Sequence, residues 1–260
     1  MTLAATVLQK KQQLDAMRAD IRIDAFAPLD HSQRLDITYT SNAIEGNTLT
    51  AGETALVIEK GITVAGKPLR DHLEAIDHAA ALEWVLDIAS RSEAPIREAD
   101  VRTLHSLVVA KSQPKVAGRY ADLPRYVNTE RGLFEFPPPL EVPVMMRDFA
   151  AWLGAAEPVP ATAFEAHRRL VAIHPFSDGN GRTARLLMNL VLARAGYPPI
   201  AVRPEDRPAY IAALEADQSG RGHELFDSLL YRRLDQTLDM YLDAARVAKS
   251  AKAAISPEED

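Results

Sequence analysis

HPFSDGNGRTAR, residues 174–185, joins two segments whose apolar residues have the spacing of helices. In the segment before it, residues recur three and four positions apart: Phe164, His167, Leu170, Val171 and His174. The segment after it opens with an almost wholly apolar run over 186–192 and is closed by Gly196 and a proline pair. We therefore expect a helix that presents His174 at its end, a turn, and a second, buried helix.

Two arginines of this stretch lie where a helix does not favour cations. Arg182 and Arg185 fall in the first turn of the second helix, where the dipole disfavours a positive charge by roughly 0.3–1 kcal/mol each. Three positions apart, they share one face and offer two forked guanidinium groups. Gly179 and Gly181 let the backbone turn its N–H groups inward, and such a nest attracts phosphate oxygens. The pattern predicts a seat for a polyphosphate.

Three more residues of the turn suit the transfer of a phosphate-linked group. Asp178 is a hard oxygen ligand beside the nest, of the kind that binds Mg²⁺ together with substrate phosphates. Asn180 can orient an oxygen without adding charge. His174 stands on a rigid helix end, where an imidazole can take a proton from an attacking hydroxyl. Together they predict a phosphoryl- or nucleotidyl-transfer site.

The composition of the whole chain is that of an ordinary globular protein. Its 260 residues are 47% hydrophobic and 25% charged, which excludes a disordered chain and allows one domain with a sizeable core. The net charge of −6 argues against a protein that mainly holds nucleic acid, and there is no cysteine for disulfides. Residues 1–20 lack a sustained apolar stretch, so we expect no signal peptide, no membrane helix and a cytoplasmic location.

The turn resembles the signature of the Fic family, His-Pro-Phe-x-(Asp/Glu)-Gly-Asn-Gly-Arg-x-x-Arg, at every fixed position. The resemblance implies an all-α Fic fold, a helical bundle around a central helix-loop-helix with a short β-hairpin flap. It also implies transfer of AMP from ATP to a protein hydroxyl, with His174 as general base and Asp178 as the Mg²⁺ ligand. The nucleotide-binding segment that it implies continues through Gly179, Asn180, Gly181, Arg182, Thr183, Ala184 and Arg185, with the two arginines on the outer phosphates.

Residues 41–47, SNAIEGN, form a second informative stretch. Ser41 and Glu45 lie four positions apart on one helical face, just before the helix stop at Gly46. A solvated helix end is the simplest interpretation, but a carboxylate near a helix C-terminus is unfavourable with the dipole and calls for a cationic partner. The stretch resembles the inhibitory motif of Fic proteins whose inhibitory helix is N-terminal. This resemblance implies that Glu45 pairs with Arg185 and turns it away from the γ-phosphate.

Hydrophobic spacing and helix breakers divide the rest of the chain into further helices. We expect an N-terminal helix within residues 1–30, packed either on the body or, as a dimer arm, on a partner chain. An inhibitory region over 31–66 and a catalytic core over 67–249 follow, and a disordered tail covers 250–260.

Some details of these helices can be stated more closely. Pro28 is expected to end the first helix, and the second begins near His31. We interpret His105, in a helix over 96–111, as structural. The helix expected over 67–90 has an apolar face made of Leu69, Leu73, Ile76, Ala80, Val85 and Ile88.

Residues 113–140 break the helical pattern with glycines and a run of prolines. Two short strands or an extended hairpin, made of residues 119–120 and 126–128, fit this composition, and so does a plain surface loop. In Fic proteins the matching region is a flap that holds a target segment by strand-like pairing, and the resemblance implies Tyr126 and Val127 as flap residues. By the same resemblance, Tyr210 and Gln218 fall where family members contact adenine or ribose, the first as a ring to stack on and the second as a polar group.

The function that we expect is a protein adenylyltransferase restrained by Glu45. It uses ATP and Mg²⁺ to modify a Ser, Thr or Tyr hydroxyl of an unidentified protein, or of itself. Removal of AMP from a modified target, with Glu45 orienting a water, fits the same site. A nucleotide-sensing regulator without catalysis and the transfer of another phosphate-linked group also stay open. We expect no nucleic-acid or membrane partner, and the N-terminal helix leaves room for a homodimer.

Overall fold

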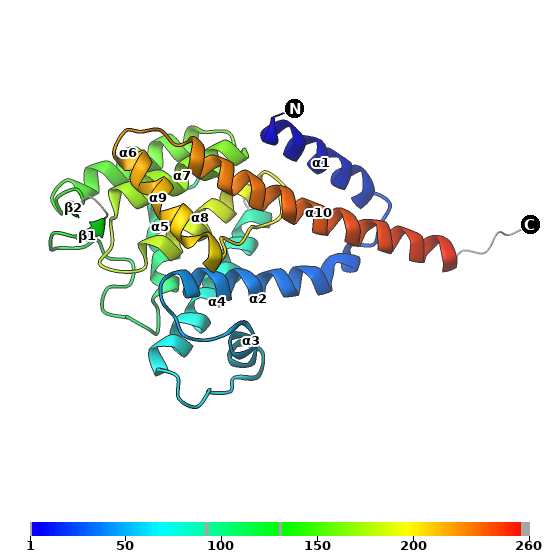
Figure 1. Ribbon diagram of the computed structural model, residues 1–260, viewed down its shortest axis with the longest axis horizontal. Helices are drawn as coiled ribbons and strands as arrows, with labels where there is room; N and C mark the ends of the chain where they lie inside the picture. Colours follow the sequence, from blue (N-terminus) through cyan, green and yellow to red (C-terminus); the bar gives the residue numbers. More distant parts are fainter. Residues whose placement is uncertain (1, 92–93, 130–131, 256–260) are drawn as a thin grey trace, which may run out of the picture.

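The computed structural model describes residues 2–91, 94–129 and 132–255 of the chain. Within these ranges the protein is mostly helical and carries a two-stranded hairpin (Figure 1). In chain order the elements are α1 (Leu3–Arg18), the 3-10 helix η1 (Ile23–Phe26), α2 (Ala27–Ile44), α3 (Ala51–Lys60), α4 (Leu69–Arg91), α5 (Glu98–Val108), β1 (Tyr126–Thr129), β2 (Gly132–Glu135), α6 (Val142–Ala155), α7 (Pro160–Ile173), α8 (Asn180–Arg194), η2 (Pro204–Asp206), α9 (Arg207–Gln218) and α10 (Glu224–Ile255).

Helix α8 is the centre of the bundle. Every residue from Arg182 to Leu192 is buried, as expected of a helix that is apolar on nearly all sides. Helices α7, α4, α5 and α2 pack around it. The prediction of a buried helix after the loop is thus confirmed, and so is the fold class of a helical bundle around a helix-loop-helix.

The N-terminal helix packs on the body of the chain. In Figure 1, α1 runs alongside the middle of α10, whose far end projects from the bundle. Val7 and Leu14 of α1 are buried, and Lys10 pairs with Asp235 of α10 at 2.6 Å. Whether α1 also meets a partner chain stays a prediction. Although α10 is 32 residues long, neither it nor any other described helix has the sustained hydropathy needed to cross a membrane.

The hairpin β1–β2 decides between the two structures that fitted residues 113–140. Its antiparallel register pairs Tyr126 with Glu135 and Thr129 with Gly132. Phe136 N continues this pairing, because it donates a hydrogen bond to Arg125 O at 3.0 Å. A strand therefore forms at 126–129 as predicted, but the predicted strand at 119–120 is wrong, since Tyr120 makes only an isolated bridge with Phe176 and the second strand is 132–135. Residues 130–131 of the turn lie outside the described residues.

Two predicted boundaries are wrong. Pro28 does not end a helix, since it lies in the first turn of α2, where proline's missing N–H costs nothing. The tail is shorter than predicted, because α10 continues through residues 250–255, in an alanine-rich sequence of high helix propensity. Residues 256–260 of the predicted tail lie outside the described residues.

The predicted apolar face of α4 is correct at Val85 but wrong at Leu69 and Ala80, which are exposed. Leu69 is 67% exposed, and the buried face is instead mixed: Asp71, His72, Glu74, Ala75, Asp77, His78, Ala81, Leu82 and Val85. Buried carboxylates are expected only where they find cations or hydrogen-bond donors. They find them in α8 and in the segments around it, which is why α4 turns its acidic face inward.

Candidate functional site

The loop between α7 and α8 is bounded by two residues with left-handed backbone. His174 caps α7 at φ 50° and ψ 55°, and among the described residues it alone has a positive φ without being glycine. Gly179, at φ 76°, precedes α8. An L-residue held in this region stores about 1–2 kcal/mol of strain, which the surrounding contacts must offset. The site is therefore built on a fixed, strained end of α7.

Asn180 closes this loop on itself. Its Nδ2 donates to Phe176 O at 2.7 Å, and its Oδ1 accepts from Phe176 N at 2.9 Å. Both ends of the buried amide are thus occupied by the loop backbone. In this conformation Asn180 shapes the site instead of facing a substrate oxygen, which differs from the role that the sequence suggested.

His105 of α5 supports the loop from below. Its Nε2 donates to Asp178 O at 3.0 Å, its Nδ1 accepts from Gly118 N at 3.0 Å, and its ring stacks on Phe176 with centroids 3.6 Å apart. Burial lowers the pKa of His105 to about 4, so the ring is neutral and can both donate and accept. The structural interpretation of His105 agrees with these contacts, although its link to the loop was not foreseen.

The first turn of α8 offers free backbone donors. Among the described residues, no acceptor meets the backbone N–H groups of Asn180, Gly181 and Arg182. Such N–H groups, together with the helix dipole, attract an anion. The side chain of Glu45 comes close to this turn: a Cβ placed on Gly181 would overlap its Oε1. A carboxylate of the same chain therefore lies against the turn that the sequence predicted as a phosphate seat.

Glu45 also reaches Arg185, as the sequence predicted. Arg185 Nη2 donates to Glu45 Oε1 at 2.7 Å and to Ser41 O at 2.8 Å, and its Nε donates to Ser41 Oγ at 2.9 Å. The arginine side chain is 4% exposed and the glutamate side chain 39%. Ser41 and Glu45, one turn apart at the end of α2, therefore both bind the guanidinium. Glu45, the more exposed of the two carboxylate–guanidinium partners, supplies the negative charge.

On its buried side, Arg185 contacts a series of hydrogen-bonded side chains. Its Nη1 lies 3.5 Å from the Tyr210 hydroxyl, which in turn lies 2.7 Å from His167 Nε2. Tyr210 is only 2% exposed, and its ring packs on Phe226. The structure brings Tyr210 to the arginine, not to an open surface, so a stacking role towards adenine has no support in this arrangement.

Arg182 is enclosed by carboxylates. Its side chain is 2% exposed, and it lies 3.4 Å from Glu74 Oε1 and 3.5 Å from Asp178 Oδ1. Although burial acts to raise it, the charge of Arg182 and a hydrogen bond from Gln113 keep the pKa of Asp178 below its usual value. Asp178 is therefore ionised at neutral pH.

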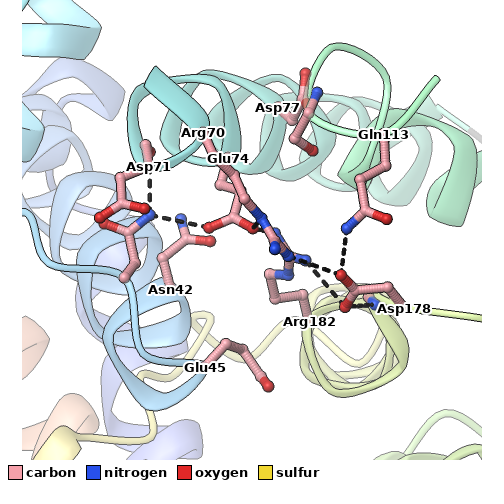
Figure 2. A network of polar contacts seen from close by, with 12 residues as sticks. Asn42, Glu45, Arg70, Asp71, Glu74, Asp77, Gln113, Asp178 and Arg182 are labelled. Carbon is pink, nitrogen blue, oxygen red and sulfur yellow. Dashed lines mark hydrogen bonds and ion pairs between the residues drawn. The ribbon is translucent and has the colours of Figure 1, made fainter. Parts of the chain in front are cut away.

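The donor chemistry of Asp178 fits a divalent cation. Among the described residues, no cluster of three or more His, Asp or Glu side chains could hold a metal by itself. Mg²⁺ often binds through one carboxylate completed by substrate phosphates and water, and Asp178 borders the anion seat. Figure 2 shows, however, that its carboxylate is already engaged by Arg70 and Gln113.

His174 faces the hairpin side of the site. Burial lowers its pKa to about 4, so the imidazole is neutral at pH 7. Nδ1 lies 3.4 Å from Val171 O, which favours the proton on Nδ1 and leaves Nε2 as the basic nitrogen. The ring of Phe136, the residue after β2, stacks on it with centroids 3.8 Å apart. The hairpin thus covers the base directly.

Of the predicted flap and base-binding residues, Gln218 lines a small pocket beside the hairpin. The pocket has a volume of about 130 Å³ and is also lined by Leu133 and Phe134. Tyr126 and Val127 are 51% and 42% exposed on the neighbouring strand. Their roles towards a target or an adenine stay predictions.

Sequence reasoning missed several residues that organise this site. They are His105, Gln113, Arg70, Glu74 and Phe136. One signal was available: Asp71, Glu74 and Asp77 recur at three-residue spacing on one face of α4, where an apolar stripe was expected. The other residues come from distant segments and leave no local pattern.

Comparison with known proteins shows which family has this loop and this sequence. The sequence pattern of the Fic/DOC family matches residues 95–192, which include the loop and most of α8. The chain is 33% identical over 260 residues to protein adenylyltransferase fic-1 of Caenorhabditis elegans, covering 92% of this chain and 50% of that protein. It is 36% identical over 214 residues to protein adenylyltransferase Fic of Nematostella vectensis, covering 80% and 49%. The chain spans about half the length of these relatives.

Solved structures of Fic proteins have the same fold as this chain. Fic-1 (aa134–508) of C. elegans superposes with a TM-score of 0.78 at 30% identity, covering 92% of this chain and 71% of that one. A Fic domain containing signaling protein from Bacteroides thetaiotaomicron superposes with a TM-score of 0.85 at 29% identity and full coverage of both chains. On its sequence, its fold and its loop, the chain belongs to the Fic/DOC family.

Proposed function

We propose that this chain is a protein adenylyltransferase that is held inactive by its own Glu45. The observation that carries the proposal is the position of the Glu45 carboxylate, which lies over Gly181 and is bonded to Arg185 at 2.7 Å. A carboxylate in this place stands where a phosphate would be expected, against the forked guanidinium of Arg185 and beside the N–H groups of the first turn. The neutral base His174 belongs to the same loop. The names of the relatives support the same activity.

The proposed reaction moves AMP from ATP to a hydroxyl of a protein. The polyphosphate lies on the N–H groups of residues 180–182 and against Arg185. His174 Nε2 takes the proton of the target hydroxyl, whose oxygen bonds to the α-phosphorus as the bond to the β-phosphate oxygen breaks. Pyrophosphate leaves. A Mg²⁺ ion held by Asp178 would neutralise part of the phosphate charge.

Glu45 restrains this reaction by occupying the seat. While it does so, the outer phosphates find no free Arg185, and the Glu45 side chain lies over the first turn of α8 where they would rest. A hydrogen bond between charged groups contributes roughly 1.5–3 kcal/mol, and the partial exposure of Glu45 places this pair towards the lower end. Since 1.4 kcal/mol corresponds to about a factor of ten, the restraint lowers activity by about tenfold.

The test uses the Glu45→Gly variant and ATP labelled at either end. Incubated with host lysate, the variant is expected to transfer label from α-labelled ATP but not from γ-labelled ATP, at about ten times the wild-type rate. Parallel reactions with GTP, CTP and UTP define the base preference, and mass spectrometry identifies the modified side chain. Glu45→Gly/His174→Ala is the matched control, and it should bind ATP without transferring AMP. Transfer of the γ-label, or equal rates for wild type and variant, would contradict the proposal.

Hydrolytic removal of AMP is the second candidate, and one observation favours it. The charges of Glu45 and Asp178 both act on His174, so carboxylate and imidazole share one site, as a base and a water-orienting group require. An AMP-modified target incubated without ATP separates the reactions. Wild type should then remove AMP faster than Glu45→Gly, whereas a pure transferase removes none. A nucleotide sensor would show binding but neither reaction.

A further inference from the structure

The carboxylate of Asp178 is bound on both oxygens. Oδ2 accepts from Arg70 Nη2 at 2.9 Å and from Gln113 Nε2. Oδ1 accepts from Gly179 N and lies 3.5 Å from Arg182 Nη2. An ionised carboxylate offers about four acceptor directions, so these four donors account for all of them.

Arg70 differs from the other donors, because it brings a full charge from the outside of the site. It belongs to the first turns of α4 and descends with Glu74 towards Asp178, as Figure 2 shows. Its side chain is 59% exposed, whereas that of Arg182 is 2% exposed. Arg70 can therefore leave the carboxylate for solvent without disturbing the core, and Arg182 cannot.

A divalent cation at Oδ2 would compete with Arg70, because Arg70 and Gln113 already use both acceptor directions of this oxygen. Mg²⁺ binds a carboxylate oxygen at about 2.0–2.1 Å and keeps several waters around it. The guanidinium nitrogen already stands 2.9 Å from the same oxygen, in the space that the ion and its waters need. Like charges so close also repel by Coulomb's law.

We propose that Arg70 is the resting counterion of Asp178 and that a divalent cation must displace it, so that Arg70 sets the metal affinity of the site. This rests on the proposed function in one respect, namely that Asp178 is the carboxylate that binds the metal. Arg70 thereby acts as a positioning residue through Asp178, and it makes the site respond to the concentration of divalent cation.

The structure also provides a place for the displaced arginine. Arg70 Nε donates to Glu74 Oε1 at 2.9 Å, a bond that can persist when Nη2 leaves Asp178. Glu74 is 8% exposed and is held in turn by Asn47 Nδ2, which donates to its Oε2 at 3.1 Å. An arginine tethered in this way remains close and returns when the cation leaves.

The test is the binding of Mn²⁺, measured by water proton relaxation with the full chain, without nucleotide and with α,β-methylene-ATP. Arg70→Gln and Arg70→Met, which both remove the charge, are expected to lower the dissociation constant for Mn²⁺ about tenfold, a typical effect of one nearby charge. Arg70→Lys keeps the charge and should stay within about twofold of wild type. Gln113→Ala removes a neutral donor from the same oxygen and should gain less than Arg70→Gln.

Arg246→Gln is the matched control. Arg246 is also exposed and paired with an aspartate, Asp243 at 2.6 Å, but it lies in the C-terminal part of α10, on an element whose described residues contribute nothing to Asp178. Its replacement should leave the Mn²⁺ affinity unchanged. Neutral variants of Arg70 that bind Mn²⁺ as wild type does overturn the inference, and so does a gain in Arg70→Lys equal to that in Arg70→Gln. Failure of AMP transfer in Glu45→Gly would refute the proposed function without altering these affinities.

Discussion

At the scale of single residues, Gly181 is the point where the restraint and the anion seat meet. Its backbone is helical, so a left-handed conformation does not explain the glycine. Space does: a Cβ here would overlap Glu45 Oε1 and stand 3.1 Å from Arg185 Nη1. The absent side chain is what allows a carboxylate to lie on the first turn of α8.

This contact predicts that Gly181→Ala changes stability with opposite signs in two backgrounds. In wild type the methyl displaces Glu45 and should lower the free energy of unfolding by ~1 kcal/mol, because the lost charged hydrogen bond outweighs the helix gain. In Glu45→Ala the overlap is gone, and alanine should stabilise the helix by ~0.5–1 kcal/mol over glycine. Urea unfolding of the four proteins measures the coupling. Equal effects in both backgrounds would show that the contact contributes nothing.

The sequence predicts residues well where a charge stands in an unfavourable place. Arg182, Arg185 and Glu45 all lie at the helix end that disfavours their charge, and each indeed has an opposite charge beside it. The sequence gives no such signal for Arg70, because exposed arginines near the start of a helix are common. Its partner Asp178 is 108 positions away in the chain, and only the fold brings the two together.

At the scale of elements, the sequence did not predict the buried polar face of α4 or the contacts of α5 with the loop. Hydrophobic periodicity located both helices correctly but assigned α4 a buried face that is only partly correct. Periodicity assumes that apolar residues face the core, and it fails where a helix is buried against cations. Both helices touch the site through polar groups, α4 through Glu74 and α5 through His105.

His105→Phe tests whether α5 supports the loop. Phenylalanine can keep the stacking on Phe176 but leaves Asp178 O and Gly118 N without their partner. Two partly buried groups without hydrogen bonds should lower the free energy of unfolding by roughly 2 kcal/mol, the low end of the cost for two unsatisfied groups. Thr103→Ala, an exposed position on the same helix, is the control and should change it by less than about 0.5 kcal/mol. A similarly small change in His105→Phe would mean that the loop is held by its other contacts alone.

At the scale of the whole molecule, the order of the helices and the place of the loop were predictable, because both depend on local spacing and on breakers. Helix ends were less so, as Pro28 and residues 250–255 show. What the sequence did not reveal is how many titratable groups the bundle encloses. Burial lowers the pKa of four histidines. The pKa falls to about 3 for His78 and to about 4 for His105 and His174, and it also lies well below its ordinary value for His167.

These histidines predict an acid-sensitive fold. In the unfolded chain each binds a proton as the pH falls through about 6.5, whereas the folded protein keeps them neutral down to about pH 4. The unfolded state therefore holds more protons in this window, and stability rises with pH. Between pH 7 and 5 the free energy of unfolding should fall by roughly 1–2 kcal/mol per histidine, while carboxylates, whose ordinary pKa values lie near 4, contribute little.

Urea unfolding at pH 7, 6 and 5 measures how the free energy of unfolding changes with pH. His78→Gln should flatten this dependence, because His78 has the pKa of about 3 and stays neutral throughout the window. Thr103→Ala should leave the pH dependence unchanged, because it alters an exposed side chain that has no titratable group. If His78→Gln lowered stability equally at all three pH values, the core histidines would be titrating in the folded protein, and the neutral state of His174 on which the proposed proton transfer depends would be in question.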